Sequence, residues 1–458
     1  MDNRQLSNKQ LRIAYVFLKP SATLRLCVQI VFVLFIRQIS FSQNPAPALP
    51  QAKSILLTGG TVHVGNGKII ENAAVGFKDG KIILAADATL IRLQNGAFDT
   101  TINVSGKQIY PGFIAANTTL GLSELELVRA TNDYTETGKL NPSVRSIVSH
   151  NTDSKVIPTI RSNGVLLAET VPQGGLISGQ SSVVELDAWN WEDAAYKTDI
   201  GIHLNWPQMT ISKTVSSIPA DTNDDVQKKN IDKSLQEIKD LFNDAKAYSK
   251  IVHPDPENLH LEAMKGLFNG TKKLFVHANN VKQIVAAVNF CKEYNISMVL
   301  VGGDDAWRVT DLLKQNNILV IIGRTHSLPS RQDEDVDLPY KLPYLLQKAG
   351  VTFCNSVDGF WQVRNIMFNA GTDVAYGLTK EEAITAITSS PAKILGIDKT
   401  VGTIEEGKDA TIIVSSGDAL DMKTNNIEMA FIRGKQINLD NVQKQLYKKY
   451  MTKYGLKM

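Results

Sequence analysis

The sequence is poor in features that mark several common protein classes. It has three cysteines in 458 residues, and only Cys291 and Cys354 lie beyond the first 43 residues. Two thiols so far apart in a chain of this length predict buried free cysteines and no disulfide scaffold. The chain also has no Gly-Xaa-Ser-Xaa-Gly motif. That absence removes the support for a hydrolase with a serine nucleophile on a strand-to-helix turn.

No excess of basic residues remains once the N-terminus is set aside. The first 43 residues hold six Lys and Arg and one Asp, and the rest of the chain holds 43 basic and 45 acidic residues. That balance, without a basic run interleaved with aromatic residues, excludes a nucleic-acid partner. Apolar residues make up 43% and charged residues 21%, as in ordinary globular proteins. The length indicates two or three packed units.

Long apolar runs are also missing, apart from a short one near the start. Basic residues precede the mostly apolar run Leu26–Ile36 of 11 residues, whereas a bilayer-spanning helix needs roughly 20. This is the pattern of a secretory signal peptide over residues 1–43, with cleavage near Ser42 or Gln43. An uncleaved anchor is the alternative. The sequence therefore predicts an exported bacterial protein, periplasmic or secreted, with no stable membrane span after processing.

The terminal parts of the remaining chain are predicted to be β-rich. A Pro-rich linker over residues 44–52 precedes short strands over 53–112, separated by Asn66-Gly67 and Asp79-Gly80. Both dipeptides tolerate the positive φ that hairpin turns require. Short strands return over 397–438. Because neither segment has enough strands for a stable sheet, we expect the two to pair as one composite β-sandwich.

The middle of the chain, residues 113–396, alternates apolar strand-like runs with helical patterns. After His277, apolar residues recur at helical spacing from Val281 to Cys291. Alternation over this length predicts an α/β fold with a (β/α)8 TIM-type barrel. The last segment, residues 439–458, is basic and amphipathic and predicts a C-terminal helix.

Several motifs together resemble the amidohydrolase superfamily, above all its imidazolonepropionase-like and exported members. The motifs are "ILLTGGTV", "YPGFI", "LTKEEAITAITSSPAKILGI", "GTIEEGKDATIIV" and "FIRGKQI". The resemblance implies a barrel hydrolase that acts on C–N bonds other than peptide bonds, in small cyclic amide, amidine or dipeptide-like substrates. It also implies a divalent metal, Zn²⁺ first, because a bound cation lowers the pKa of its water to about 7.

The first barrel strand of such proteins usually ends in His-Xaa-His, and here the sequence departs from the family. The two positions hold Asn117 and Thr119. A neutral amide or hydroxyl is a poor ligand for Zn²⁺ compared with imidazole. The strand-one half of the metal site is therefore predicted to be degraded, with both side chains left as substrate-binding groups.

The resemblance assigns the remaining metal ligands unevenly. His277 corresponds to the strand-five histidine, and Asp358 to the strand-eight aspartate that both binds metal and takes a proton from water. Asn355 and Ser356 are rival alignments for strand eight. Strand six has no histidine, and strand four has no certain ligand; the nearest metal-capable or catalytic side chains are Asp304 and Asp305 for strand six and Glu169 and Lys265 for strand four.

Three further residues are predicted to contact substrate: His326, Arg331 and Arg364. The first two lie in a polar loop after strand seven, and loops at that end of a barrel build active sites. Arg364, beyond strand eight, would hold a substrate carboxylate. Each also has a structural alternative, as a solvated loop residue or as a residue that pins the chain.

Two functions remain open on this sequence. The first is a hydrolase with a reduced, mononuclear metal site around His277 and Asp358. The second is a catalytically inactive relative, without a metal, that serves as a binding or partner protein. The partners implied are a small-molecule substrate and either a second copy of the chain or an active paralogue.

Overall fold

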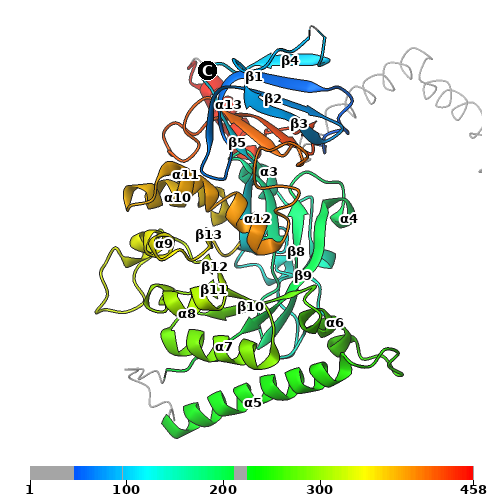
Figure 1. The fold of residues 1–458 in the computed structure, drawn as a ribbon, viewed down its shortest axis with the longest axis vertical. Coiled ribbons are helices and arrows are strands. Elements are labelled where there is room, and N and C mark those ends of the chain that lie inside the picture. Colours follow the sequence, from blue (N-terminus) through cyan, green and yellow to red (C-terminus); the bar gives the residue numbers. More distant parts are fainter. Residues whose placement is uncertain (1–45, 95, 211–223, 457–458) are drawn as a thin grey trace, which may run out of the picture. The chain divides into compact units, whose positions relative to one another are not determined.

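The structure is a computed structural model that describes residues 46–94, 96–210 and 224–456. The predicted signal peptide lies outside the described residues. Two β-sheets of eight strands each organise the described chain (Figure 1). No helix in the described ranges is both long enough and apolar enough to cross a membrane.

The first sheet joins the two ends of the described chain. Strand β14 pairs antiparallel with β5, with Ile413 opposite Tyr110, and Figure 1 shows the orange C-terminal strands beside the blue N-terminal ones. The predicted composite sandwich is thus confirmed. Its strands run in the order β16-β15-β14-β5-β1-β2-β3, with β4 paired to β1. Their bounds are β1 (Ile55–His63), β2 (Ile69–Lys78), β3 (Lys81–Asp87), β4 (Thr100–Asn103), β5 (Gln108–Pro111), β14 (Ile412–Ser415), β15 (Ile427–Ile432) and β16 (Lys435–Gln436).

The turn between β2 and β3 follows the dipeptide prediction. Asp79 and Gly80 connect the strands with φ of 50° and 80°, and Lys78 pairs with Lys81 on either side. Two successive positive φ values match a tight two-residue hairpin, which aspartate and glycine accommodate at low cost.

The second sheet closes into the barrel. Its strands follow the chain from β6 to β13, and a parallel bridge between Ala116 and Ser356 joins the first to the last. The predicted barrel is confirmed, with one irregularity: β8 is antiparallel to both β7 and β9. The bounds are β6 (Phe113–Thr118), β7 (Val165–Thr170), β8 (Ile177–Glu185), β9 (Ala195–Asn205), β10 (Lys273–Ala278), β11 (Met298–Gly302), β12 (Leu319–Ile322) and β13 (Phe353–Asn355).

The helices lie mainly in the barrel part of the chain. The helix expected after His277 is α7 (Val281–Tyr294), which begins with a capping box between Asn280 and Gln283. The other helices are α3 (Ile157–Arg161), α4 (Trp191–Ala194), α5 (Asp224–Tyr248), α6 (Leu259–Phe268), α8 (Thr310–Gln315), α9 (Leu338–Ala349), α10 (Ile366–Ala375), α11 (Lys380–Thr385), α12 (Ser389–Leu395) and α13 (Val442–Lys453). Short 3-10 turns are η1 (Arg129–Thr131), η2 (Ser146–Ser149), η3 (Ala306–Arg308) and η4 (Gln362–Asn365).

Alternation along β10 separates the inside of the barrel from its outside. Leu274 and Val276 pack in the large cluster that includes the surrounding helices. Phe275 instead packs with side chains from the other barrel strands. Since successive side chains of a strand point to opposite faces, His277 follows Phe275 on the inner face. The barrel thus directs this histidine toward its own axis.

Gly201 on β9 makes room for this inner layer. A Cβ atom there would lie 2.4 Å from Cε2 of Phe275 and 2.5 Å from the backbone oxygen of Lys273. Both neighbours are held by the barrel, so neither can move aside easily. Glycine at this position is therefore a packing requirement.

Gly201→Ala is expected to destabilise the protein by about 1–3 kcal/mol, because an added methyl group overpacks the barrel interior. Urea unfolding followed by far-UV circular dichroism measures the change. Gly323→Ala is the matched control, since a Cβ atom there meets nothing within 4 Å, and its effect should stay within about 0.5 kcal/mol. Equal effects for the two variants would contradict the packing role of Gly201.

Candidate active site at the barrel mouth

A buried carboxylate lies at the centre of the candidate site. Glu169, on β7, has no exposed surface. Its Oε2 accepts a hydrogen bond from the backbone N–H of Asn117 at 2.9 Å. Its Oε1 accepts one from the hydroxyl of Ser181 at 2.7 Å. Two donors from neighbouring strands thus stabilise a charge that would otherwise be costly to bury.

Two histidines continue from this carboxylate toward the strand ends. His203 on β9 is fully buried, and its Nε2 lies 3.5 Å from Oε1 of Glu169, an ion-pair distance. Its Nδ1 lies 2.9 Å from Nε2 of His277. The ring of His203 stacks on Phe275 at 4.7 Å and 9°. Glu169, His203 and His277 therefore form a chain, which we call the Glu-His-His chain.

The order of contacts in the Glu-His-His chain suggests which ring nitrogens of His203 and His277 carry hydrogen atoms. We assign the hydrogen atom of His203 to Nε2, which lies 3.5 Å from the carboxylate without a hydrogen bond to it, so that Nδ1 of the same ring accepts the hydrogen atom on Nε2 of His277. This arrangement leaves the Nδ1 lone pair of His277 for another partner. Burial, with a contribution from the His203 ring, lowers the pKa of His277 to about 3. The free ring is therefore neutral at pH 7, and it is partly exposed at the end of β10.

The arrangement of donors does not fit the metal that the family resemblance implies. A metal ion needs several donor atoms that converge on one point. Here one ring nitrogen of His203 lies near Glu169 and the other contacts His277, so both nitrogens of this ring already have protein neighbours. Across the described parts of the chain, no group of three or more His, Cys, Asp or Glu could hold a metal ion.

The strand-one positions contribute backbone to this site. Asn117 has φ of 54°, a left-handed conformation that asparagine adopts more readily than most residues. The N–H of this residue donates to Oε2 of Glu169. Thr119 is buried, and its N–H donates to the carbonyl oxygen of Gly359 at 2.9 Å. Their predicted role in substrate binding stays a prediction.

Asp358 lies apart from the Glu-His-His chain. It is exposed in the loop after β13 and lines a cavity of about 240 Å³ formed after β11, β12 and β13. Within the described residues Asp358 forms no hydrogen bond or ion pair, and His277 does not line this cavity. The cavity wall also carries Asp304, Glu334 and Arg324. The structure thus places Asp358 at the mouth without joining it to His277.

The predicted substrate-binding residues His326, Arg331 and Arg364 all have protein partners. Nε2 of His326 lies 2.7 Å from Oγ1 of Thr372. The guanidinium of Arg331 makes two hydrogen bonds to Asp305, at 3.1 and 2.7 Å. Arg364 donates to the carbonyl oxygen of Trp361 and covers its ring at 4.5 Å. Their contact with substrate remains a prediction.

Two residues of the site were missed from the sequence, namely His203 and Ser181. His203 lies in "GIHLNW" and Ser181 in "ISGQSS", which are β9 and β8. The usable signal was the alternation of small and apolar residues before His203, which is typical of a strand with one buried face. For Glu169 the sequence indicates only that it lies in range for strand four.

Comparison with known proteins identifies the family. A family model described as the amidohydrolase family matches residues 191–437, more than half of the 458-residue chain. The chain belongs to the amidohydrolase family, which confirms the resemblance seen in its sequence motifs. No curated protein sequence matches it.

Solved structures agree on the fold. An amidohydrolase from Thermotoga maritima MSB8 is similar with a TM-score of 0.71 and 22% identity, over 83% of this chain and 99% of that one. A Xaa-Pro dipeptidase with bound methionine in its active site has a TM-score of 0.51 and 12% identity, over 84% and 99%. An A. niger ochratoxinase has a TM-score of 0.51 and 15% identity, over 84% and 96%. At these identities the likeness establishes the shared fold.

A second buried carboxyl lies behind the ends of β12 and β13. Asp373 on α10 has no exposed surface. It accepts hydrogen bonds from Thr325 at 2.8 Å and from Nδ2 of Asn355 at 2.5 Å. Burial outweighs these donors and raises the pKa of Asp373 to about 7. The folded protein therefore binds this proton more tightly than the unfolded chain does.

The raised pKa of Asp373 predicts that the free energy of unfolding falls as pH rises between about 4 and 7, because the folded state must lose a proton that it holds. From pH 5 to 8 the loss should be about 3 kcal/mol, because the difference in bound protons persists over about two pH units at about 1.4 kcal/mol each. Asp373→Asn should remove this part of the pH dependence in urea titrations. Asp311→Asn, at an exposed position on α8, is the control. A wild-type slope that persists in Asp373→Asn would contradict the assignment.

The absence of a three-donor group in the described residues predicts weak metal retention. Protein incubated with Zn²⁺ and then desalted should keep well below one ion per chain by inductively coupled plasma mass spectrometry, because a tight zinc site needs at least three converging protein donors. One tightly held Zn²⁺ per chain that is lost in His277→Ala would show that the side chains rearrange into a metal site.

Proposed function

We propose that the protein hydrolyses a C–N bond of a small amide substrate at the barrel mouth, with His277 as the group that faces the substrate. The observation that carries the proposal is the Glu-His-His chain, which ends at the carboxyl end of a barrel strand. Active sites of barrel enzymes lie at that end. Family membership supports the reaction class.

The chain of contacts supports proton transfer in two stages. In the first, water attacks the amide carbonyl carbon and Nδ1 of His277 takes its proton, at a cost in free energy that follows from the lowered pKa of this ring. In the second, the C–N bond breaks and the same proton passes to the leaving nitrogen. His203 and Glu169 act behind His277: they fix its orientation, and the carboxylate stabilises the positive charge that develops on the rings.

The charges at the mouth favour a substrate with polar ends. The 240 Å³ cavity beside the site carries three acidic side chains, Asp304, Glu334 and Asp358, and the exposed cation Arg324. A dipeptide-like amide has both an ammonium and a carboxylate group that such a wall accommodates. One structure of the same fold is a Xaa-Pro dipeptidase, so dipeptide-like amides are the first substrates to test.

His277→Ala is expected to lower kcat/KM by about 10²–10⁴-fold on any dipeptide or N-acyl amino acid that the wild-type protein cleaves, since general acid–base catalysis contributes about that much. Release of the free amine, measured by ninhydrin or mass spectrometry, gives the rates. The assay is run in chelator-treated buffer and again with added Zn²⁺.

His253→Ala is the matched control, because this histidine is exposed in the loop before α6, and it should retain full activity. Turnover by wild-type protein that survives in His277→Ala would overturn the role of His277. Absence of turnover on all substrate classes under both metal conditions would instead support the non-catalytic, binding function.

A further inference from the structure

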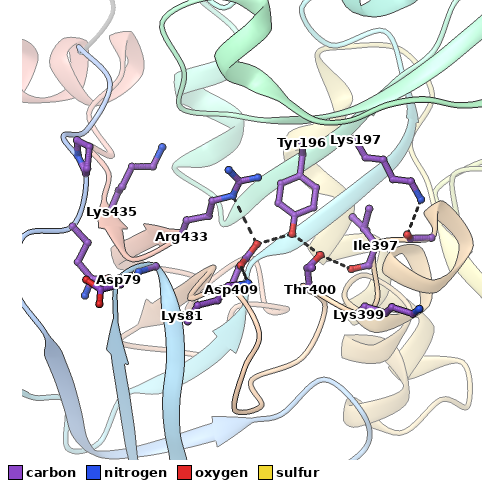
Figure 2. A pocket seen from close by; sticks show the side chains of 14 residues that line it. Asp79, Lys81, Tyr196, Lys197, Ile397, Lys399, Thr400, Asp409, Arg433 and Lys435 are labelled. Atoms are coloured by element: carbon purple, nitrogen blue, oxygen red, sulfur yellow. Dashed lines mark hydrogen bonds and ion pairs between the residues drawn. The ribbon is translucent and has the colours of Figure 1, made fainter.

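A second cavity lies away from the barrel mouth, between the sandwich and the barrel. It has a volume of about 930 Å³, within the range of ligand pockets. Its lining includes Lys81 and Arg433 from the sandwich and Tyr196, Lys197 and Lys399 from the barrel part. Figure 2 shows Tyr196 and Arg433 at the centre, with lysines on both sides.

The cavity is remote from the Glu-His-His chain. Tyr196 and His203 are both on β9 (Ala195–Asn205) and are seven residues apart. At about 3.3 Å per residue they are separated by roughly 23 Å along the strand. A ligand in this cavity would therefore not occupy the candidate active site.

Buried acids fix the cations on the sandwich side. Asp409 is 7% exposed, and its Oδ1 lies 2.5 Å from Nζ of Lys81. Glu185 is 3% exposed, and its carboxylate lies 2.7 Å from Nε of Arg433 and 3.7 Å from Nζ of Lys435. Since each cation has a buried counter-ion, its position is set before any ligand arrives.

Arg433 keeps part of its hydrogen-bonding capacity free. Its ion pairs to Glu185 and Asp409 are both made through Nε, and its guanidinium covers the ring of Tyr196 at 4.8 Å. The hydroxyl of Tyr196 donates to Asp409 at 2.7 Å. The two Nη groups of Arg433 form no hydrogen bond with any residue that the structure describes. A guanidinium held in this way presents a planar pair of donors, which suits an oxyanion.

Positive charge also remains on the barrel side. Lys197 donates to the carbonyl oxygen of Gly396 at 2.8 Å, and Lys399 is exposed. Within the described ranges neither lysine forms an ion pair. The cavity lining thus has five cations, Lys81, Lys197, Lys399, Arg433 and Lys435, against two lining acids, Asp79 and Asp409, and the buried Glu185 behind Arg433 and Lys435.

We infer that this cavity binds a small molecule with a doubly charged oxyanion group, a phosphate or a pair of carboxylates, held by Arg433 on the sandwich side and Lys399 on the barrel side. The excess of cations over acids supplies the charge, and the anchored guanidinium supplies the directed donors. Such a ligand would contact both the sandwich and the barrel and so stabilise the folded chain.

Thermal unfolding of the full chain tests the site with two probes, sodium phosphate and sodium succinate, each compared with sodium chloride at equal ionic strength. A saturable rise in Tm with phosphate, confirmed by isothermal titration calorimetry, supports a phosphate-bearing ligand. The same result with succinate alone supports a dicarboxylate. No saturable rise above chloride with either probe overturns the inference.

Two variants locate the binding. Arg433→Lys keeps the charge beside Glu185 and Asp409 but loses the paired donors, and Lys399→Gln removes an exposed cation without a partner in the described structure. Each should raise the apparent Kd about tenfold, as expected for loss of one charged hydrogen bond. Lys282→Gln, on the exposed side of α7, makes the same charge change as Lys399→Gln and should leave Kd unchanged. Equal Kd values for Lys399→Gln, Arg433→Lys and Lys282→Gln would show non-specific binding and overturn the site.

Discussion

A carboxylate without exposed surface lies inside the barrel, and its stabilisation constrains the strands around it. Removing an unpaired charge from water costs several kcal/mol, so Glu169 needs donors on every side. It accepts hydrogen bonds from the backbone N–H of Asn117 and the hydroxyl of Ser181, and the ring of His203 lies 3.5 Å away. These three groups come from β6, β8 and β9, on either side of β7. One buried group therefore fixes the relative register of four consecutive barrel strands.

This constraint also explains what stands at the strand-one positions. The backbone N–H of Asn117 donates to Glu169, and the residue lies in the left-handed region, with φ of 54°. Asparagine tolerates that conformation, so the residue type fits the backbone role. The positions where the family resemblance implies imidazole ligands thus supply a hydrogen-bond donor and a buried threonine, Thr119. The polar chemistry of the barrel is concentrated instead on β7, β9 and β10.

Whether a feature of the fold or the site could be predicted from the sequence depended on how far apart along the chain its interacting residues lie. The Asp79-Gly80 hairpin and the helix after His277 depend on local rules of turns and caps, and both were predictable. The barrel and the composite sheet followed from the order of β and α segments and from the family motifs. His203 was not predictable in the same way, because its role depends on His277, 74 residues further along the chain. The antiparallel direction of β8 could not be predicted either. No motif in its sequence marks it, because the pairing of a strand depends on its neighbours in the sheet.

Strand β9 contributes to both the Glu-His-His chain and the cavity beside the sandwich. Near the start of β9, the hydroxyl of Tyr196 donates a hydrogen bond to Asp409 beside the sandwich. Near its end lies His203. Between them Gly201 allows the Phe275 ring to approach, and that ring stacks on His203. The strand is thus fixed at one end by a buried acid from the sandwich side and at the other by Glu169. Because a slip of one residue would turn both Tyr196 and His203 to the opposite face, each polar anchor supports the geometry of the other.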